Sequence, residues 1–541
     1  MIYNEKKKAF IFLKLKHFLK RNLRGILFLL ILFFIFDSIY SFWPSDIRPC
    51  KVPSWHGVLQ CQSIAISEVV YGLKNNIGYR KVYEAFYPSL ESGDDGVSIL
   101  KMNEAISKAI NLEKVDENGV HYLLGTGTSV GMIDFLKISY GLFGYKAESQ
   151  YYLYAVLFLL PIVLYLLTFY YNINYIILLC IYLISYNIIV STSVVSFETV
   201  IGVRFFPLLT ILPIIYLFLI ITQNVNLSIK HIFYTSIQVG ILFFSFHIRS
   251  HSKYHFIVLF LVLIVLAAIR CANKYKLNKK MYLSLSGMKV WPLYIVTVFF
   301  VVWFIYVGFL RPASPTDKES VYPIWHQIFI GLGGHPRALE RYGIAFSDAT
   351  GLQYAIKLNA SKGIKIDYDL AVKEIVQGIY PSSQNFYFTG RKYEELMRSA
   401  YFKILLNDPL FVFYSYVHKV PVYFKALFSN SKTPSFLPSQ YGNVNLIAKL
   451  FNIKVILSII LICHFYSTRF NNYFYHLKSF YCLLFLDFLF SIIPPIITVP
   501  AVHSVLDSGL IFTILILLFI VQTGSYLKHK SKAMFCKAIK P

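Results

Sequence analysis

Asp94 and Asp95 form an acidic pair within the glycine-flanked stretch Glu91-Ser-Gly-Asp94-Asp95-Gly. A carboxylate in such a turn can take a proton from an attacking hydroxyl group, as a general base does. The same side chains would also suit the cap of a helix that begins near Val97, because Asp oxygens accept hydrogen bonds from free backbone N–H groups. Both interpretations stay open on the sequence alone.

Three basic residues, Arg249, His251 and Lys253, stand close together in a short segment between two apolar blocks. Cations grouped in this way suit the phosphate of a lipid. Their alternative role is to anchor the chain in lipid headgroups, because long basic side chains extend to the membrane surface.

His326 follows Trp325 in a second long polar segment and could hydrogen-bond a phosphate or an acceptor group, or serve only the local structure. No Cys and His spacing resembles a zinc site. No metal site is therefore predicted, and a divalent cation is the one cofactor left open.

The elements that must position these residues are transmembrane helices. Hydrophobic residues make up 56% of the 541 positions, charged residues only 15%, and the mean hydropathy is +0.56. Soluble domains carry about 25% charged residues, and a bilayer core needs a helix of about 20 apolar residues. Blocks of that kind predict ten spans, at 25–43, 150–170, 174–191, 205–222, 231–248, 253–270, 290–310, 446–467, 475–497 and 506–526. The predicted fold class is an all-α polytopic membrane protein with two large extracytoplasmic loops that contain amphipathic juxtamembrane helices.

Lysine and arginine gather in the segments that this arrangement places in the cytosol, and Glu5 is the only acidic residue there. The positive-inside rule therefore predicts that both termini are cytosolic. The net charge of +25 is then a topology signal and an attraction to anionic membrane lipids. Nucleic-acid binding is not expected, because no basic block has a folded domain to present it.

The predicted organisation places nearly all the polar chain on the outer face. It comprises a basic cytosolic N-terminus (1–24), the first span (25–43), a large extracytoplasmic loop (44–149), six spans (150–310), a second large loop (311–445), three spans (446–526) and a basic cytosolic tail (527–541). Each loop contains a pattern that fits one face of a helix. In the first loop the apolar residues of this face are Val97, Ile99, Leu100, Ala105, Ile106, Ala109 and Ile110. In the second loop the pattern lies within 391–428, where one helix is predicted to end at Asp408-Pro409 and an interfacial helix to begin.

This loop pattern resembles the GT-C superfamily of membrane glycosyltransferases, and in particular bacterial proteins similar to dolichyl-phosphate-mannose protein mannosyltransferases. The resemblance is carried by the acidic pair in 91–96, the glycine-rich link 125–128, the apolar run 132–144 that ends in Phe143-Gly144, and echoes in 322–334, 393–398 and 407–409.

The resemblance implies that a sugar moves from a polyprenyl-phosphate carrier to a glycan, lipid or protein acceptor on the extracytoplasmic face, as in cell-envelope glycan biosynthesis in a bacterial cytoplasmic membrane. Asp94 or Asp95 would be the catalytic base. Glu198 and Arg204 correspond to a second polar cluster at the entry to the fourth span, and would join the residues that bind donor phosphate or acceptor.

Two other classes of protein stay open. An O-antigen polymerase also has many spans and two large outer loops, and the second loop here carries Arg311, Arg337, Arg341, Arg391 and Arg398. A non-catalytic lipid or polysaccharide transport protein is the other. Transporters favour repeated halves and polar midplane residues, whereas the predicted spans hold few ionisable groups; of these, Asp487 is expected to pair with a neighbouring helix.

The orientation can be tested by cysteine labelling. Single cysteines introduced between 311 and 445 should react with a membrane-impermeant maleimide in intact cells, because the positive-inside rule places this loop outside. Complete protection of the loop from the reagent would show that the orientation is inverted.

Overall fold

The computed structural model describes a set of helices that make up most of the predicted membrane region and parts of both large loops. The described residues are 22–43, 56–73, 79–90, 99–115, 130–190, 205–223, 225, 228–248, 254–265, 290–305, 324–363, 391–428, 455–456, 459, 474–497 and 508–523. In these ranges the regular elements are helices, and no strand occurs.

Four of the described helices are long and apolar enough to cross a membrane: α2 (Leu23–Phe42), α7 (Ser149–Phe169), α8 (Ile173–Val190) and α10 (Ile229–Ile248). Their apolar stretches are 18 to 21 residues long, which at about 1.5 Å per residue gives roughly the 30 Å of a bilayer core. The protein is therefore an all-α membrane protein.

Five helices with shorter apolar parts overlap further predicted spans. They are α9 (Phe206–Thr222), Tyr254–Val265, α12 (Val290–Ile305), α21 (Phe474–Ile497) and Ser508–Thr523. Of the predicted span at 446–467, only residues 455, 456 and 459 belong to the described part of the chain. The total of ten spans therefore stays a prediction.

Helix α9 is buried along its whole length, and α8 along nearly all of it. Helix α2 packs on α8 and turns Phe28, Phe33 and Phe36 outward, where they would meet lipid. Side-chain hydrogen bonds between the described helices include one that joins the hydroxyls of Tyr154 and Tyr186, 3.1 Å apart. This fits membrane helices, which associate through close packing and a few polar contacts because lipid tails supply no hydrophobic driving force.

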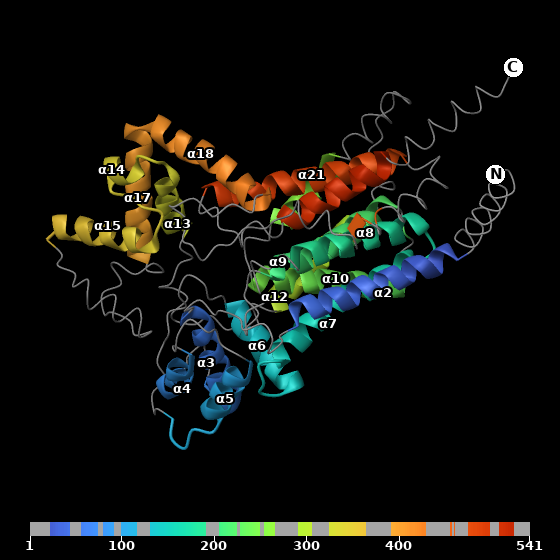
Figure 1. Cartoon of the computed structure of the whole chain (residues 1–541), viewed down its shortest axis with the longest axis horizontal. Coiled ribbons are helices and arrows are strands. Elements are labelled where there is room, and N and C mark those ends of the chain that lie inside the picture. The colour runs from blue at the N-terminus through green and yellow to red at the C-terminus, as the bar shows by residue number, and fades with distance from the viewer. Residues whose placement is uncertain are drawn as a thin grey trace, which may run out of the picture.

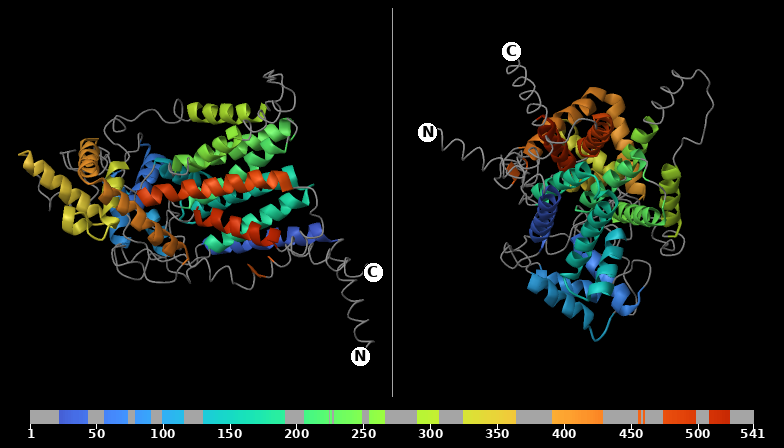
Figure 2. Two further views of the ribbon diagram at one scale, coloured as in Figure 1. Left: turned by 90° about the horizontal axis from the view of Figure 1, so that it is seen from above. Right: turned by 90° about the vertical axis from the view of Figure 1, so that its right-hand side faces the viewer.

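The polar helices form two modules at the same end of the bundle, as Figure 1 and the left view of Figure 2 show. The first outer module comprises α3 (His56–Tyr71), α4 (Arg80–Leu90), α5 (Ile99–Ile110) and α6 (Val130–Phe143). The second outer module comprises α13 (Ile324–Gly331), η5 (Leu332–Gly334), α14 (Ala338–Tyr342), α15 (Asp348–Ser361), α17 (Arg391–Asn407) and α18 (Pro409–Phe428). We call this end of the bundle the outer end, following the predicted orientation.

Helix α5 is amphipathic and falls within the range predicted to be the first large loop. Its buried stripe consists of Met102, Ala105, Ile106 and Ala109, the spacing of one helical face. Leu100 was predicted to share that face, but it falls beside the stripe and is 66% exposed. The side chain of Asn103 joins α5 to the start of α7 through the carboxylate of Glu148 and the backbone N–H of Ala147.

The second outer module has a hydrophobic core of its own, which includes Phe329, Met397, Ile404 and Phe411. Its two long helices meet at Asp408, as the sequence predicts. The carboxylate of Asp408 accepts a hydrogen bond from the backbone N–H of Phe411 at 3.3 Å and so caps α18. Tyr423 and Ser508 are hydrogen-bonded through their hydroxyls, and this contact ties α18 to the Ser508–Thr523 helix of the bundle.

Helix α6 touches α10 through Gly131. A Cβ atom on Gly131 would lie 2.5 Å from the backbone carbon and oxygen of His247 and 2.6 Å from the nitrogen of Ile248. Backbone atoms cannot yield as a flexible side chain can, so only glycine permits this approach.

Gly131→Ala should therefore destabilise the first outer module by about 1–3 kcal/mol, the usual cost of overpacking. Gly141→Ala is the matched control on the same helix, because nothing lies within 4 Å of a Cβ there; alanine should be neutral or slightly stabilising. Thermal unfolding of both variants in detergent measures the difference. Equal melting temperatures would contradict the close contact.

Candidate functional site

Most of the residues predicted to do chemistry lie outside the described part of the chain. These are Asp94, Asp95, Glu198, Arg204, Arg249, His251 and Lys253. Their roles stay predictions, and the structure bears on them only through the elements that flank them.

His326 is described, and its side chain is fully buried in the second outer module. Its Nδ1 atom lies 2.6 Å from the hydroxyl of Tyr393, and its backbone N–H donates to the Glu394 carboxylate at 2.9 Å. Trp325 donates its backbone N–H to the other Glu394 oxygen. The imidazole thus ties α13 to α17, and a phosphate or acceptor could reach it only if this module opened.

A cluster of ionisable side chains lies where α3, α6 and α10 meet at the outer end. Asp134 and Lys137 come from α6, Glu68 from α3 and His247 from the last turn of α10. His247 Nε2 lies 2.9 Å from Asp134 Oδ2, and Lys137 Nζ lies 2.6 Å from Glu68 Oε2 and 3.8 Å from Asp134 Oδ1. We call these four residues the outer cluster.

Local structure explains why these side chains meet. Gly131 brings the first turn of α6 against the backbone at His247, and Asp134 follows one turn later on the same face. Lys137 lies one turn further on and reaches α3. His247 lies near the C-terminus of α10, where the helix dipole favours a positive charge.

The outer cluster is partly accessible. The side chain of Lys137 is 35% exposed, that of Asp134 24% and that of His247 11%. In the cluster, two carboxylates hold two basic groups at the surface of the bundle, and Arg249 follows His247 by two residues in the sequence. A protonated imidazole and an ammonium group held in this way can donate charge-assisted hydrogen bonds to a phosphate.

Buried polar side chains continue from the outer cluster along the interface of α3 and α6. Gln62, Ser63 and Ser67 of α3 are fully buried. The hydroxyl of Tyr140 on α6 donates to the Gln62 side-chain oxygen. Within the described residues, Gln62 Nε2 and Ser63 Oγ have no hydrogen-bond partner. Such atoms call for water or a ligand, so the interface beside the outer cluster is suited to polar groups.

A second ionisable pair lies within the membrane bundle. His255 Nδ1 is 2.8 Å from Asp487 Oδ1, and the two side chains are 0% and 1% exposed. This contact joins the first turn of the Tyr254–Val265 helix to the middle of α21, in agreement with the expected pairing of Asp487 with a neighbouring helix. Breaking a buried pair by removing one partner commonly costs 3–5 kcal/mol, so the pair fixes these helices together.

Basic side chains also gather at the base of the second outer module. Arg341 and Tyr342 both contact Asp408, at 2.8 and 2.9 Å. Burial and nearby basic groups, His418 foremost, lower the pKa of His335. Lys419 of α18 is fully buried, its stem packs on Gly334, and its ammonium nitrogen lies 3.4 Å from the Ile497 carbonyl oxygen at the end of α21.

Within the described residues, no group of three or more His, Cys, Asp or Glu side chains could hold a metal ion. The outer cluster offers two carboxylates and one imidazole, but Lys137 already lies between the two carboxylates.

Lys419 should make the stability of the folded protein depend on pH. Burial lowers its pKa from 10.5 to about 7, so between these values the unfolded chain binds one proton more than the folded chain. Stability should therefore rise with pH across that window, by about 1.4 kcal/mol per pH unit for one proton. In Lys419→Met the rise should be absent, while exposed Lys403→Met on α17 should retain it. Unfolding of the three proteins at pH 6 to 9 decides; identical slopes would contradict the assignment.

Comparison with protein-family models, with curated proteins and with solved structures finds no significant match to this chain.

Proposed function

We propose that the protein is an integral membrane glycosyltransferase that moves a sugar from a polyprenyl-phosphate carrier to an acceptor on the extracytoplasmic face. The observation that carries this proposal is the outer cluster. It brings His247, at the outer end of the membrane helix α10, together with Lys137 of α6. The basic segment Arg249, His251 and Lys253 follows His247 closely in the sequence. Basic groups of this kind suit a lipid-linked phosphate.

The chemistry needs two kinds of group. The acceptor hydroxyl oxygen attacks the anomeric carbon, and the bond from that carbon to the phosphate oxygen breaks, leaving its electron pair on the phosphate. His247, Lys137 and the following basic segment would stabilise the charge that develops there. Glu68 and Asp134 would hold these donors in position, since pre-oriented groups need no rearrangement during the reaction.

The hydroxyl proton must pass to a base, and Asp94 and Asp95 are the predicted candidates. Helix α5 begins at Ile99, shortly after this pair, and belongs to the first outer module, which also supplies Glu68, Asp134 and Lys137 of the outer cluster. This supports a division of work in which the acidic loop takes the proton and the outer cluster binds the phosphate.

A transport protein is the second candidate function, and the buried His255–Asp487 pair favours it. Ionisable residues inside a membrane bundle commonly belong to ion or substrate pathways. That pair joins two helices in full burial, however, whereas the outer cluster is accessible.

Kinetics can separate the proposed roles. With undecaprenyl-phosphate-linked glucose, mannose and galactose as donors, His247→Gln should raise the KM for the donor about 10- to 100-fold, because one charge-assisted hydrogen bond contributes roughly 1.5–3 kcal/mol. Asp94→Asn or Asp95→Asn should instead lower kcat by about 10²–10⁴, the usual contribution of a general base. Release of polyprenyl phosphate by the protein in nanodiscs measures both.

His231→Gln is the matched control, because His231 lies at the opposite end of the same helix, next to Ser228. It should leave both constants unchanged. Donor kinetics that are equally normal in His247→Gln, Asp134→Asn and His231→Gln would exclude the outer cluster from the site. Full activity of the double variant at Asp94 and Asp95 would exclude the acidic pair.

A further inference from the structure

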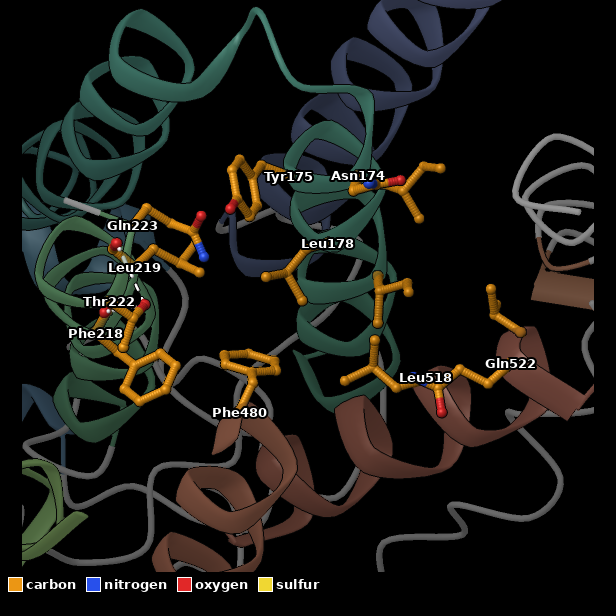
Figure 3. Close-up of a pocket in the computed structure, with 13 residues that line it drawn as sticks. Asn174, Tyr175, Leu178, Phe218, Leu219, Thr222, Gln223, Phe480, Leu518 and Gln522 are labelled. Carbon is orange, nitrogen blue, oxygen red and sulfur yellow. Dashed lines mark hydrogen bonds between the residues drawn. The ribbon is translucent and has the colours of Figure 1, made fainter. Parts of the chain in front are cut away.

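A cavity lies at the opposite end of the bundle from the outer modules. It is enclosed by the start of α8, the end of α9, the start of the apolar part of α21 and the end of the Ser508–Thr523 helix. Figure 3 shows side chains of these four helices converging on it. Under the predicted orientation these helix ends lie in the cytosolic leaflet of the membrane.

The lining changes with depth. Farther along the helices from these ends, the cavity is bounded by apolar side chains: Leu178 and Ile181 of α8, Phe218 of α9, and Leu518. At the helix ends its lining includes Asn174, Gln223 and Gln522, whose side chains end in carboxamides. Asn174 is the second residue of α8, and Gln223 directly follows α9. An apolar interior with an uncharged polar rim is the pattern that an amphiphile requires.

The cavity arises because α8 packs chiefly on α2 and α7 and leaves its other side apart from α9 and α21. Its volume is about 70 Å³, far below the 300–1,000 Å³ of pockets that take whole drug-sized ligands. Atoms that line an empty space lose dispersion contacts. Part of a single hydrocarbon chain would restore them, and the membrane around these helices supplies such chains.

Charge indicates which lipid would enter. The segments predicted to lie at this end carry Lys230, Lys528, Lys530 and Lys532, and their only acidic residue is Glu5. Basic juxtamembrane residues attract anionic headgroups, at about 1 kcal/mol each. The carboxamide rim can then donate and accept hydrogen bonds with the ester or phosphate oxygens that join the chain to its headgroup.

We propose that this cavity binds one hydrocarbon chain of an anionic lipid from the cytosolic leaflet, with the linkage oxygens at Asn174, Gln223 and Gln522. The site is distinct from the outer cluster, and it requires that the protein spans the membrane in the predicted orientation. It does not depend on the proposed glycosyltransferase activity.

Photocrosslinking tests the proposal in the intact protein. The protein is reconstituted in phosphatidylcholine nanodiscs with phosphatidylglycerol that carries a diazirine on its acyl chain, and the crosslinked peptides are mapped by mass spectrometry. Crosslinks should concentrate several-fold on the cavity residues of α8 and α9, compared with the lipid-facing residues Phe33 and Phe36 of α2. An even distribution over both surfaces would overturn the proposal.

A filled cavity provides the second measurement. Leu178→Trp should reduce crosslinking at α9 at least fivefold, because the indole would occupy the space. The control, Leu167→Trp, adds the same side chain to an exposed position of α7 and should change nothing. If Leu178→Trp does not fold, the crosslinking map of the wild-type protein still tests the proposal.

Two further probes identify the lipid. Diazirine-labelled polyprenyl phosphate in place of the phospholipid shows whether the chain is isoprenoid or acyl, and labelling of the cavity by either supports the proposal. Labelled phosphatidylcholine should crosslink weakly at the cavity. If it crosslinks as strongly as the anionic lipids, headgroup charge has no part and that element of the proposal is wrong.

Discussion

A lipid bilayer offers no hydrogen-bond partner to backbone N–H and C=O groups, and the rest of this structure depends on that constraint. Within the described residues, the apolar stretches satisfy it by forming helices. Ionisable side chains are consequently confined to two situations. They either pair in full burial, as His255 and Asp487 do, or they lie at the ends of the helices, as the outer cluster does. Any chemistry of the described bundle is thereby directed to its ends.

The two outer modules lie at the same end of the bundle but are attached to it in different ways. The first outer module has no separate core, because Met102, Ala105 and Ile106 belong to the hydrophobic core of the bundle itself. It is therefore rigidly placed, and the Gly131 contact fixes its register against α10. The second outer module has its own core and meets the bundle mainly through α18. A rigid module is suited to reacting groups, whereas a module with a core of its own can move as a unit.

The membrane helices were the predictable part of the fold, because apolar blocks of sufficient length have few alternatives. Helix α10 follows its prediction closely although Thr235, Ser236 and Gln238 interrupt its apolar character; Gln238, for example, donates to the Pro161 carbonyl oxygen within the bundle. Helices α3 and α4 were not predicted. Buried Gln62 and Ser63 in α3 and Pro88 in α4 hide the helical pattern, which tertiary contacts then stabilise.

The candidate site was only partly predictable. Asp134 and Lys137 lie in the run 132–144 that carries the family resemblance, and His247 ends an apolar block two residues before the predicted basic segment. The sequence shows that an ionisable residue lies at the end of a predicted span, and such a residue is a candidate for a functional site. The sequence does not show which residues pair with it, because Glu68, Asp134 and His247 come from three helices that only the fold brings together. His326 shows the reverse case, since a polar residue type beside a tryptophan gives no indication of full burial.

The attachment of α18 has a mechanical consequence. Lys419 contacts the last turn of α21, and Asp487 in the middle of α21 pairs with His255. His255 comes two residues after Lys253 in the chain. Helices are stiff rods, and each of these joints is a buried polar contact that resists sliding. A displacement of the second outer module relative to the bundle would therefore have to break or shift the contact of Lys419 with α21.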